Sequence, residues 1–398
     1  MSNVATAILK KGREDSLLRR HPWVFSGAID RVTGNPEPGA TVIVRASDGR
    51  FLGSGAWSPE SQLRVRIWSY SQDDSIDAEF FRRRIEQAAE QREEFSFPPD
   101  TTAFRLVSSE ADGLPGLVVD RYGDYMVCQF NAAGVEYWKK EILNALREQF
   151  PECSVLDRSD GDVRMREGLP EVGMDAGDGI PDAPLEVREH GMPMLADVVH
   201  GHKTGMYLDQ RENRALLRSL AADADILNCF SYTGGFACAA LNGGARSVLD
   251  CDLSGDALAL AQRNVRMQRC EEQRYGQQQG DVFHVLRSFR DAARSFDIII
   301  LDPPKFAWSA ATVVKAARGY KDINLLALKL LRPGGMLLTF SCSGHITAPL
   351  FRKIVADAAV DAHVDVTVLR ELTQAADHPV ALHVPETLYL KGLLLRLR

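Results

Sequence analysis

The chain has 398 residues, of which 45% are hydrophobic and 25% are charged, and its formal net charge is −7 at pH 7. This length corresponds to two or three domains of about 100–200 residues, and the composition is typical of globular proteins with apolar cores. The acidic balance does not indicate a nucleic-acid-binding protein, and no run of about 18 apolar residues indicates a membrane span.

The seven cysteines are scattered along the chain and form no Cys-x-x-Cys pair. An odd number in this arrangement predicts neither a disulfide framework nor a zinc site, and we expect no metal. The N-terminal stretch lacks the apolar segment and the cleavage site of an export signal. These features together predict a cytoplasmic protein with reduced thiols.

Short strand patterns separated by turns characterise residues 1–75. Residues 41–44 follow a turn rich in Pro and Gly, and residues 62–68 alternate polar and apolar side chains as a half-buried strand does. These patterns predict a small β-barrel-like domain. Its strand over 62–68 would present Arg64 and Arg66 on one face.

A central domain of α+β type is predicted over residues 76–195. It begins with a helix over 76–94. The following pattern predicts strands at 104–107, 117–120, 125–130, 154–156 and 185–187, with a helix at 136–150 between the third and the fourth strand.

Strand and helix patterns alternate over residues 196–398, which predicts an α/β domain. Two near-continuous apolar runs, 296–301 and 336–340, suit parallel strands that are buried on both faces. The helix over 316–331 lies between them. We therefore expect a doubly wound sheet, which binds its ligand at the carboxyl ends of its strands. Further helices are expected at 209–221, 236–242 and 255–268, and further strands at 225–230, 247–251, 364–369 and 387–393.

Four features at the ends of these strands indicate a cofactor site. The turn over 228–236 has two adjacent glycines but no G-x-G-x-x-G, which disfavours classical dinucleotide binding. Asp252 ends the next strand, where a carboxylate accepts hydrogen bonds from a ribose; Asp250 is the competing candidate. Asp281 lies at the next strand end along the chain after Asp252. Its carboxylate could accept a hydrogen bond from an adenine amino group. Asp302 follows the apolar run 296–301.

Two prolines directly after Asp302 give this strand end a rigid edge without backbone donors. In their order along the chain, the four features resemble the class I S-adenosylmethionine-dependent methyltransferase fold. The resemblance implies S-adenosylmethionine as the cofactor. The candidate contacts in these features are Asn228, Tyr232, Gly234, Asp252, Asp281 and Asp302.

A nucleophile candidate, Cys342, follows the strand over 336–340, on the same rim as Asp302. Cytosine C5 is not a ready nucleophile and becomes one after a thiolate adds at C6. A thiol titrates near about 8.5 in free cysteine, so Cys342 needs local help to be deprotonated. Asp302 could hydrogen-bond the base edge and promote its protonation. The other reading of Cys342 is a small buried residue.

Several segments closely resemble the ribosomal RNA large subunit methyltransferase I family: residues 20–25, 201–211, 230–236, 302–306, 341–343 and 388–392. The resemblance covers essentially the whole chain and implies formation of 5-methylcytidine in 23S rRNA. It implies a PUA domain for RNA over 1–75, the central domain over 76–195 and the methyltransferase over 196–398. It also assigns the nucleophile to Cys342 and places the segment 203–211 at the cofactor, with Tyr207 and Gln210 as candidates.

If the N-terminal region is a PUA domain, we expect its basic residues to contact RNA phosphates. The expected RNA contacts are Lys10, Lys11, Arg19, Arg20, Arg64, Arg66 and Lys305. Many RNA cytosine-C5 enzymes have a second cysteine in the Asp-Pro-Pro region, and this chain has none there. Product release would therefore depend on another base.

Two other functions remain open at this stage. The Asp302–Phe306 motif also resembles enzymes that methylate amino groups, and a guanine or adenine nitrogen of RNA would then be the target. A non-catalytic RNA-binding or ribosome-assembly factor with the same fold is the second alternative. The expected partner is large-subunit ribosomal RNA. No membrane partner is expected, and a homodimer is allowed.

Overall fold

The computed structural model describes residues 5–94, 100–159, 161–172 and 179–398, and the chain divides into two compact units. The first unit consists of Met1–Val187, Ala196–Met206 and Ala376–Thr387. The second unit consists of Arg188–Leu195, Tyr207–Ala375 and Leu388–Arg398. Within the described residues, no helix has the length and apolar character needed to cross a membrane.

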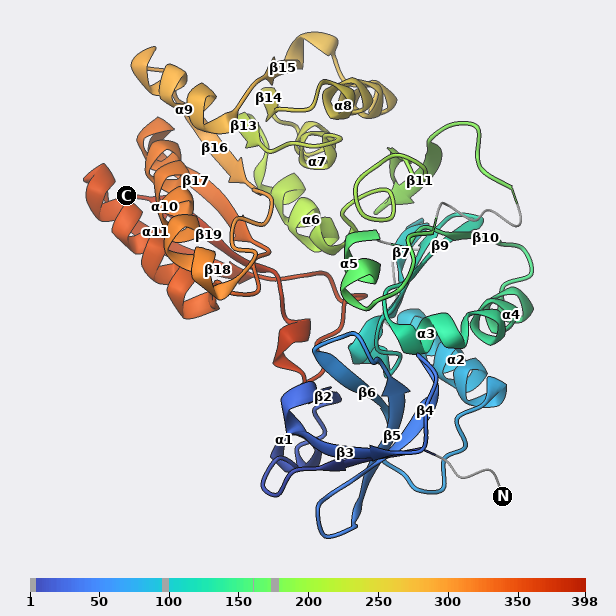
Figure 1. Ribbon diagram of the computed structural model, residues 1–398. Helices are drawn as coiled ribbons and strands as arrows, with labels where there is room; N and C mark the ends of the chain where they lie inside the picture. Colours follow the sequence, from blue (N-terminus) through green and yellow to red (C-terminus); the bar gives the residue numbers. More distant parts are fainter. Residues whose placement is uncertain (1–4, 95–99, 160, 173–178) are drawn as a thin grey trace. The chain divides into compact units, whose positions relative to one another are not determined.

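The first unit begins with a mixed six-stranded sheet in the order β2-β6-β5-β4-β1-β3 (Figure 1). Alternate residues of β4 and β6 point into a core that includes Val42, Val44, Val65 and Ile67, as the alternating pattern predicted. The elements are β1 (Thr6–Leu9), α1 (Asp15–Leu18), β2 (Trp23–Phe25), β3 (Ile29–Thr33), β4 (Thr41–Arg45), β5 (Phe51–Trp57) and β6 (Leu63–Ser69).

A four-stranded sheet in the order β10-β9-β8-β7 follows in the first unit. Its core contains Phe81, Leu117, Phe130 and Leu146. The helix expected over 136–150 is interrupted at Trp138, whose backbone leaves the helical region. The elements are α2 (Ala78–Glu94), β7 (Ala103–Ser108), β8 (Leu117–Tyr122), β9 (Tyr125–Phe130), α3 (Ala133–Tyr137), α4 (Lys139–Gln149), β10 (Ser154–Asp157) and α5 (Gly161–Arg166).

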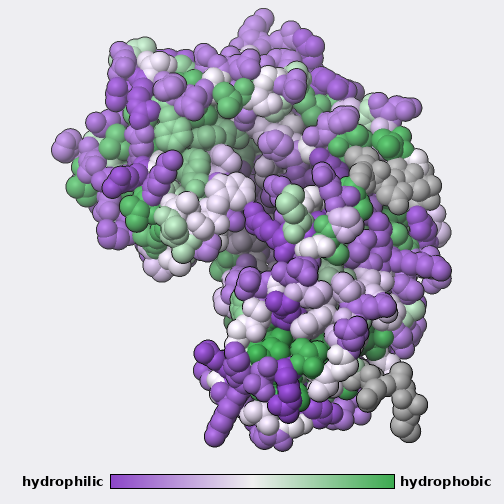
Figure 2. All heavy atoms as spheres, viewed as in Figure 1, coloured by the Kyte–Doolittle hydropathy of each residue, from purple (hydrophilic) through white to green (hydrophobic). Residues whose placement is uncertain are grey.

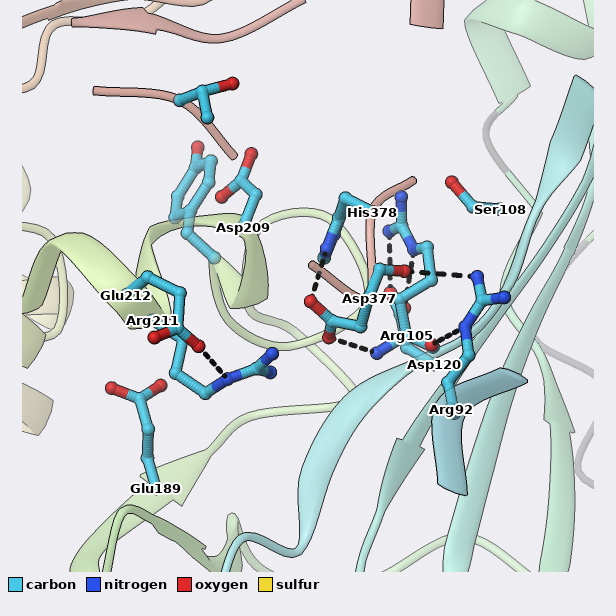
Figure 3. Close-up of polar contacts among 12 residues, drawn as sticks. Arg92, Arg105, Ser108, Asp120, Glu189, Asp209, Arg211, Glu212, Asp377 and His378 are labelled. Atoms are coloured by element: carbon cyan, nitrogen blue, oxygen red, sulfur yellow. Dashed lines mark hydrogen bonds and ion pairs between the residues drawn. The ribbon is translucent and has the colours of Figure 1, made fainter. Parts of the chain in front are cut away.

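The segment Ala376–Thr387 comes from the C-terminal part of the chain but belongs to the first unit. The carboxylate of its Asp377 accepts a hydrogen bond from the backbone N–H of Arg105 at 2.8 Å and lies 3.0 Å from Nδ1 of His378 (Figure 3). The guanidinium of Arg92 donates to the carbonyl oxygen of Asp377 at 3.1 Å. The three domains expected from the sequence do not include this exchange of segments, and their bounds remain a prediction.

The second unit contains a seven-stranded sheet in the order β15-β14-β13-β16-β17-β19-β18. The first five strands in this order are parallel, and β19 lies antiparallel between β17 and β18. The expected doubly wound sheet is thereby confirmed. The strands are β13 (Asp225–Cys229), β14 (Ser247–Asp252), β15 (Tyr275–Gln279), β16 (Phe296–Leu301), β17 (Leu331–Ser341), β18 (Val366–Leu372) and β19 (Lys391–Leu397).

Helices cover both faces of this sheet (Figure 1). Apolar side chains of α9, α10 and α11 form one core with β13, β16, β17 and β19. On the other face, α7 contacts both α6 and α8. The helices are α6 (Arg211–Leu220), α7 (Gly235–Asn242), α8 (Gly255–Met267), α9 (Val282–Asp291), α10 (Val313–Leu330) and α11 (Ala348–Ala362). A separate two-stranded sheet pairs β11 (Leu185–Glu189) with β12 (Met192–Ala196).

Candidate active site

Asp302 and Cys342 follow adjacent parallel strands of the second unit. Asp302 comes directly after β16 and Cys342 directly after β17, and the register pairs Leu301 with Thr339. Carboxyl ends of parallel strands lie at the same edge of a sheet, so both side chains reach the same rim, as the sequence predicted. Both residues are partly exposed. The rim therefore brings a carboxyl group and a thiol to the same edge of the sheet.

The two serines that flank Cys342 hold its backbone in place. Ser341 and Ser343 are both fully buried, and each hydroxyl lies 3.0 Å from the hydroxyl of Tyr320 in α10. The backbone N–H of Ala307 donates to Oγ of Ser343 at 3.2 Å. This network ties the end of β17 to the loop after Asp302. The serines thus fix the position of Cys342 rather than point toward a substrate.

The remaining six cysteines lie in a different environment. Cys270 is partly exposed, and the other five are buried. Burial raises the pKa of Cys251 to about 12, and it raises the pKa of the Cys229 thiol well above its usual range. The seven cysteines, all within the described residues, form no disulfide. The five buried thiols are therefore poorly suited to react at neutral pH.

The carboxyl group of Asp302 has a pKa close to neutral pH. Burial, followed by the charge of Asp209, raises the pKa of Asp302 to about 7, while a hydrogen bond from Gln210 opposes this rise. Gln210 is buried, and its side-chain oxygen accepts from Nδ2 of Asn213 at 2.6 Å. Gln210 thus lies beside Asp302, and its expected contact with the cofactor stays a prediction.

Two tyrosines stand beside these groups. The rings of Tyr207 and Tyr232 contact each other edge to face, with centroids 5.3 Å apart. Burial raises the pKa of the Tyr207 hydroxyl, and negative charge on Asp302, on Tyr232 and on Cys342 raises it further. The tyrosine hydroxyl therefore stays protonated at neutral pH and can donate a hydrogen bond. The structure brings Tyr207 and Tyr232 together with Asp302 and Cys342.

The turn after β13 has an unusual backbone. Phe230, Tyr232 and Gly234 have φ angles of 58°, 48° and 76°, which L-residues other than glycine seldom adopt. A Cβ atom at Gly234 would lie 2.9 Å from Cβ of Ala261, so a side chain would not fit there. The N–H of Tyr232 donates to the carboxylate of Asp252 at 2.8 Å. Strain of this kind is characteristic of ligand-binding turns.

The structure distinguishes between the two aspartates of β14. Asp250 is fully buried and accepts hydrogen bonds from Asn228 at 2.8 Å and from the Tyr275 hydroxyl at 2.7 Å. Asp252 is partly exposed at the strand end. Asp252 is therefore the more accessible of the two aspartates, and its expected contact with a ribose stays a prediction. The buried hydrogen bond between Asn228 and Asp250 supports the turn after β13.

Asp281 has a structural task that the sequence did not reveal. It caps α9, and its carboxylate accepts from the backbone N–H of His284 at 3.1 Å. A cap of this kind stabilises a helix by about 1 kcal/mol. Its expected role at an adenine remains a prediction.

The basic residues expected to contact RNA differ in their surroundings. Lys11 and Arg19 are exposed, while Lys10 is exposed and donates to the carbonyl oxygen of Gly27 at 2.9 Å. The guanidinium groups of Arg20 and Arg64 lie 4.9 Å and 5.6 Å from aromatic ring centroids. In the second unit, Lys305 lies 5.3 Å from the ring centroid of Trp308.

Arg66 is the exception among these basic residues. Its guanidinium makes two hydrogen bonds, of 2.6 Å and 2.7 Å, with the carboxylate of Glu167, and both side chains are mostly buried. A guanidinium whose charge is neutralised in this way is poorly suited to a phosphate, so the structure does not support the expected contact between Arg66 and RNA. The face of the molecule seen in Figure 2 is largely hydrophilic. In the N-terminal sheet region of the chain, the apolar side chains of Leu18 and Phe25 are 55% and 54% exposed.

Three functional candidates escaped the sequence reasoning. The Tyr389 hydroxyl donates to the carboxylate of Asp209 at 2.8 Å, and Lys391 lies beside Cys342. Arg214 is buried, pairs with Glu189 at 2.5 Å and donates to the carbonyl oxygen of Tyr207 at 2.9 Å. Asp209 and Tyr389 belong to the segments 201–211 and 388–392, which the sequence marks as motifs. The sequence does not predict the contact between them, because the two residues are far apart in the chain.

Two family models match the chain, that of PUA-like domains over residues 7–70 and that of S-adenosylmethionine-dependent methyltransferases over residues 160–394. The chain is 50% identical over 392 residues to ribosomal RNA large subunit methyltransferase I of Tolumonas auensis, covering 98% of this chain and 99% of that one. The chain belongs to the ribosomal RNA large subunit methyltransferase I family. The member of this family from Aeromonas salmonicida is 49% identical over 391 residues, covering 98% of each chain.

Solved structures share the fold of this family member over nearly the full chain. SMU.776, a putative methyltransferase complexed with SAH, matches with a TM-score of 0.86 at 22% identity, covering 98% of this chain and 99% of that one. A putative SAM-dependent methyltransferase from Streptococcus mutans matches with a TM-score of 0.84 at 23% identity, with the same coverage. The comparisons confirm the resemblance seen in the sequence, the class I fold and S-adenosylmethionine as the cofactor.

The residues at the carboxyl ends of β13 and β14 fit this cofactor. Among the described residues, the buried Oγ of Ser231 and Oδ1 of Asn228 have no hydrogen-bond partner within the protein. A polar ligand at this turn would satisfy such groups, because buried polar atoms are rarely left unpaired. The close approach of the backbone at Gly234 and the carboxylate of Asp252 suit a ligand with a ribose.

Proposed function

We propose that this protein methylates C5 of a cytosine in 23S ribosomal RNA through a transient bond between Cys342 and C6 of the base. The observation that carries the proposal is the placement of Cys342 and Asp302 at the ends of adjacent parallel strands. The names of the relatives support large-subunit ribosomal RNA as the substrate.

The chemistry begins with addition of the Cys342 thiolate to C6, which forms a carbon–sulfur bond. Asp302 has a pKa of about 7, so a large fraction carries a proton at neutral pH. Asp302 donates this proton to N3 of the cytosine, and the electron pair of the C5–C6 double bond becomes available at C5. S-adenosylmethionine, when bound, supplies the electrophilic methyl group. A base then removes the proton from C5, the carbon–sulfur bond breaks and Cys342 leaves as a thiolate, while N3 returns its proton to Asp302.

The cofactor would be held by the turn after β13 and by the end of β14. Asp252 would accept from the ribose hydroxyls, and the residues Asn228, Tyr232 and Gly234 would form or support the wall of the site. Tyr207 would lie between the cofactor and the base, because it is near Asp302 and Cys342. Asp281 would accept a hydrogen bond from the adenine amino group in addition to capping α9.

The N-terminal sheet of the first unit would hold the RNA by its phosphates. Lys10, Lys11, Arg19, Arg20 and Arg64 supply the positive charge, and the exposed Phe25 offers a face on which a base can stack. Lys305 would add a phosphate contact near the thiol. The match of residues 7–70 to PUA-like domains supports this assignment. A cytoplasmic location follows from the ribosomal substrate, and a homodimer stays part of the proposal.

Nucleoside mass spectrometry of ribosomal RNA tests the proposed product. We expect loss of one 5-methylcytidine from 23S rRNA in cells that lack this protein, and its return when the wild-type chain is expressed. The Cys342→Ala variant should not restore it, whereas Cys270→Ala, at the other partly exposed cysteine, should. A missing methylguanosine or methyladenosine would favour the base-nitrogen alternative. An unchanged nucleoside profile would favour a non-catalytic role.

A further inference from the structure

Lys391 lies against the backbone that carries Cys342. It is the first residue of β19, and the antiparallel register pairs it with Ser341, the residue before Cys342. Its Nζ donates to the carbonyl oxygen of Ser343, the residue after Cys342, at 2.8 Å. The lysine therefore meets the chain on both sides of the thiol. The mechanism above gives Lys391 no task.

Several ionisable groups surround Lys391 and Cys342. Lys305, from the loop after β16, and Cys342 are the ionisable groups that act on Lys391. The charge of Cys342 also acts on the hydroxyl groups of Tyr207 and of Tyr320 in α10. Both tyrosines are held protonated, because burial raises their pKa. The lysine is thus a positive charge close to the thiol, on the rim that also carries the carboxyl group of Asp302.

A half-buried lysine in such a place needs a compensating interaction. Burial lowers the pKa of Lys391 to about 8, Lys305 lowers it as well, and the negative charge of Cys342 opposes both. The interaction between two titrating groups is mutual, so the ammonium favours the thiolate by the same free energy by which the thiolate favours the ammonium. This reciprocity supplies the local help that a cysteine needs to react at neutral pH.

We propose that Lys391 is a positioning residue that stabilises the Cys342 thiolate and fixes the backbone from Ser341 to Ser343. The use of this thiolate in methyl transfer rests on the proposed function, whereas its formation does not. The hydrogen bond to Ser343 orients the ammonium, and the pairing of β19 with β17 sets its distance from the rim. An arginine at this position would keep the charge, and an uncharged side chain would remove it.

Alkylation of the full-length protein by iodoacetamide measures the thiolate directly, without RNA or cofactor. The rate at the Cys342 peptide would be followed by mass spectrometry between pH 5.5 and pH 10 as a test range. We expect Lys391→Gln to move the apparent pKa of the thiol upward by about one unit, which slows alkylation at neutral pH about tenfold. Lys391→Arg should stay within about twofold of the wild type, and Cys270 in the same samples should not change.

Superimposable alkylation profiles of Lys391→Gln and the wild type would overturn this inference. A second measurement guards against misfolding of the variant: NMR titration of the Lys391 side chain in the wild-type protein, before and after Cys342 is blocked by neutral carbamidomethylation. The blocked protein should show a lower lysine pKa, because the favourable negative charge is gone. An unchanged lysine titration would also overturn the inference.

The outcome is independent of the fate of the proposed function. If 5-fluorocytidine RNA forms no bond with Cys342 and yet Lys391→Gln raises the thiol pKa, the cytosine-C5 proposal fails while the role of Lys391 stands. If the bond forms and the thiol pKa is indifferent to Lys391, the cytosine-C5 proposal stands and the role of Lys391 fails.

Discussion

The side-chain amide of Gln210 donates a hydrogen bond to the carboxyl group of Asp302. The oxygen of the same amide accepts from Asn213, so the orientation of Gln210 is fixed. This contact connects the start of α6 with the end of β16. It also sets the protonation of the group that, in the proposed mechanism, delivers a proton to the base.

Replacement of Gln210 by leucine should change the pH dependence of the reaction. The hydrogen bond from Gln210 lowers the pKa of Asp302 from the higher value that burial would impose, so its loss should raise that pKa. Asp302 acts in its protonated form, and the decline of the rate at alkaline pH should therefore move upward by about 0.5–1 unit. The measurement is the rate of adduct formation with 5-fluorocytidine RNA against pH. Gln278→Leu, at an exposed residue of β15, is the control, and an unshifted alkaline limb would contradict the assigned role.

Asp252→Ala should weaken cofactor binding. The carboxylate orders the turn through the N–H groups of Tyr232 and Ser254, at 2.8 Å and 2.9 Å, and would also accept from the ribose. Loss of a charged hydrogen bond costs about 1.5–3 kcal/mol, so the Kd for S-adenosylhomocysteine should rise roughly 10- to 100-fold. Calorimetry measures this constant. Asp256→Ala, at an exposed position four residues later, should bind as the wild type does; equal affinity of both variants would remove Asp252 from the site.

Asp250→Asn should alter how stability depends on pH. Burial raises the pKa of Asp250 to about 7 from 3.8, so the native state holds this proton more tightly than the unfolded chain does. The contribution of Asp250 is therefore present at low pH and is lost between about pH 4 and pH 7, at up to about 1.4 kcal/mol per pH unit. Asparagine does not titrate. The urea midpoint of the variant should gain on that of the wild type from pH 5 to pH 8, and a constant difference over this range would show that Asp250 is not protonated in the native state.

The sequence predicted the strands of the second unit better than its helices. The run 296–301 coincides with β16, because a strand buried on both faces is apolar throughout. Neither α9 nor α11 was predicted, although both helices bury apolar side chains in the core. The helix expected over 136–150 ignored the break at Trp138, which no glycine or proline marks.

The candidate site was predictable to the extent that it follows strand ends. Asp302 and Cys342 could be placed on one rim from the order of the strands alone. The pairing of Gln210 with Asp302 could not, because it joins residues from separate elements. For Arg66, the alternating pattern of the strand predicted a side chain available to RNA. The buried carboxylate of Glu167, about a hundred residues later in the chain, neutralises the charge of its guanidinium, and the strand pattern could not predict this pairing.

The central claim is that Cys342 forms a bond with C6 of a cytosine. The decisive measurement is mass spectrometry of the peptides obtained after the protein is incubated with S-adenosylmethionine and a 23S rRNA fragment that contains 5-fluorocytidine. Fluorine at C5 prevents the release step, because a proton is no longer there to be removed. The account predicts a methylated fluorocytidine attached to the peptide that contains Cys342. An absent adduct, together with full methyl transfer to RNA by Cys342→Ala, would contradict it.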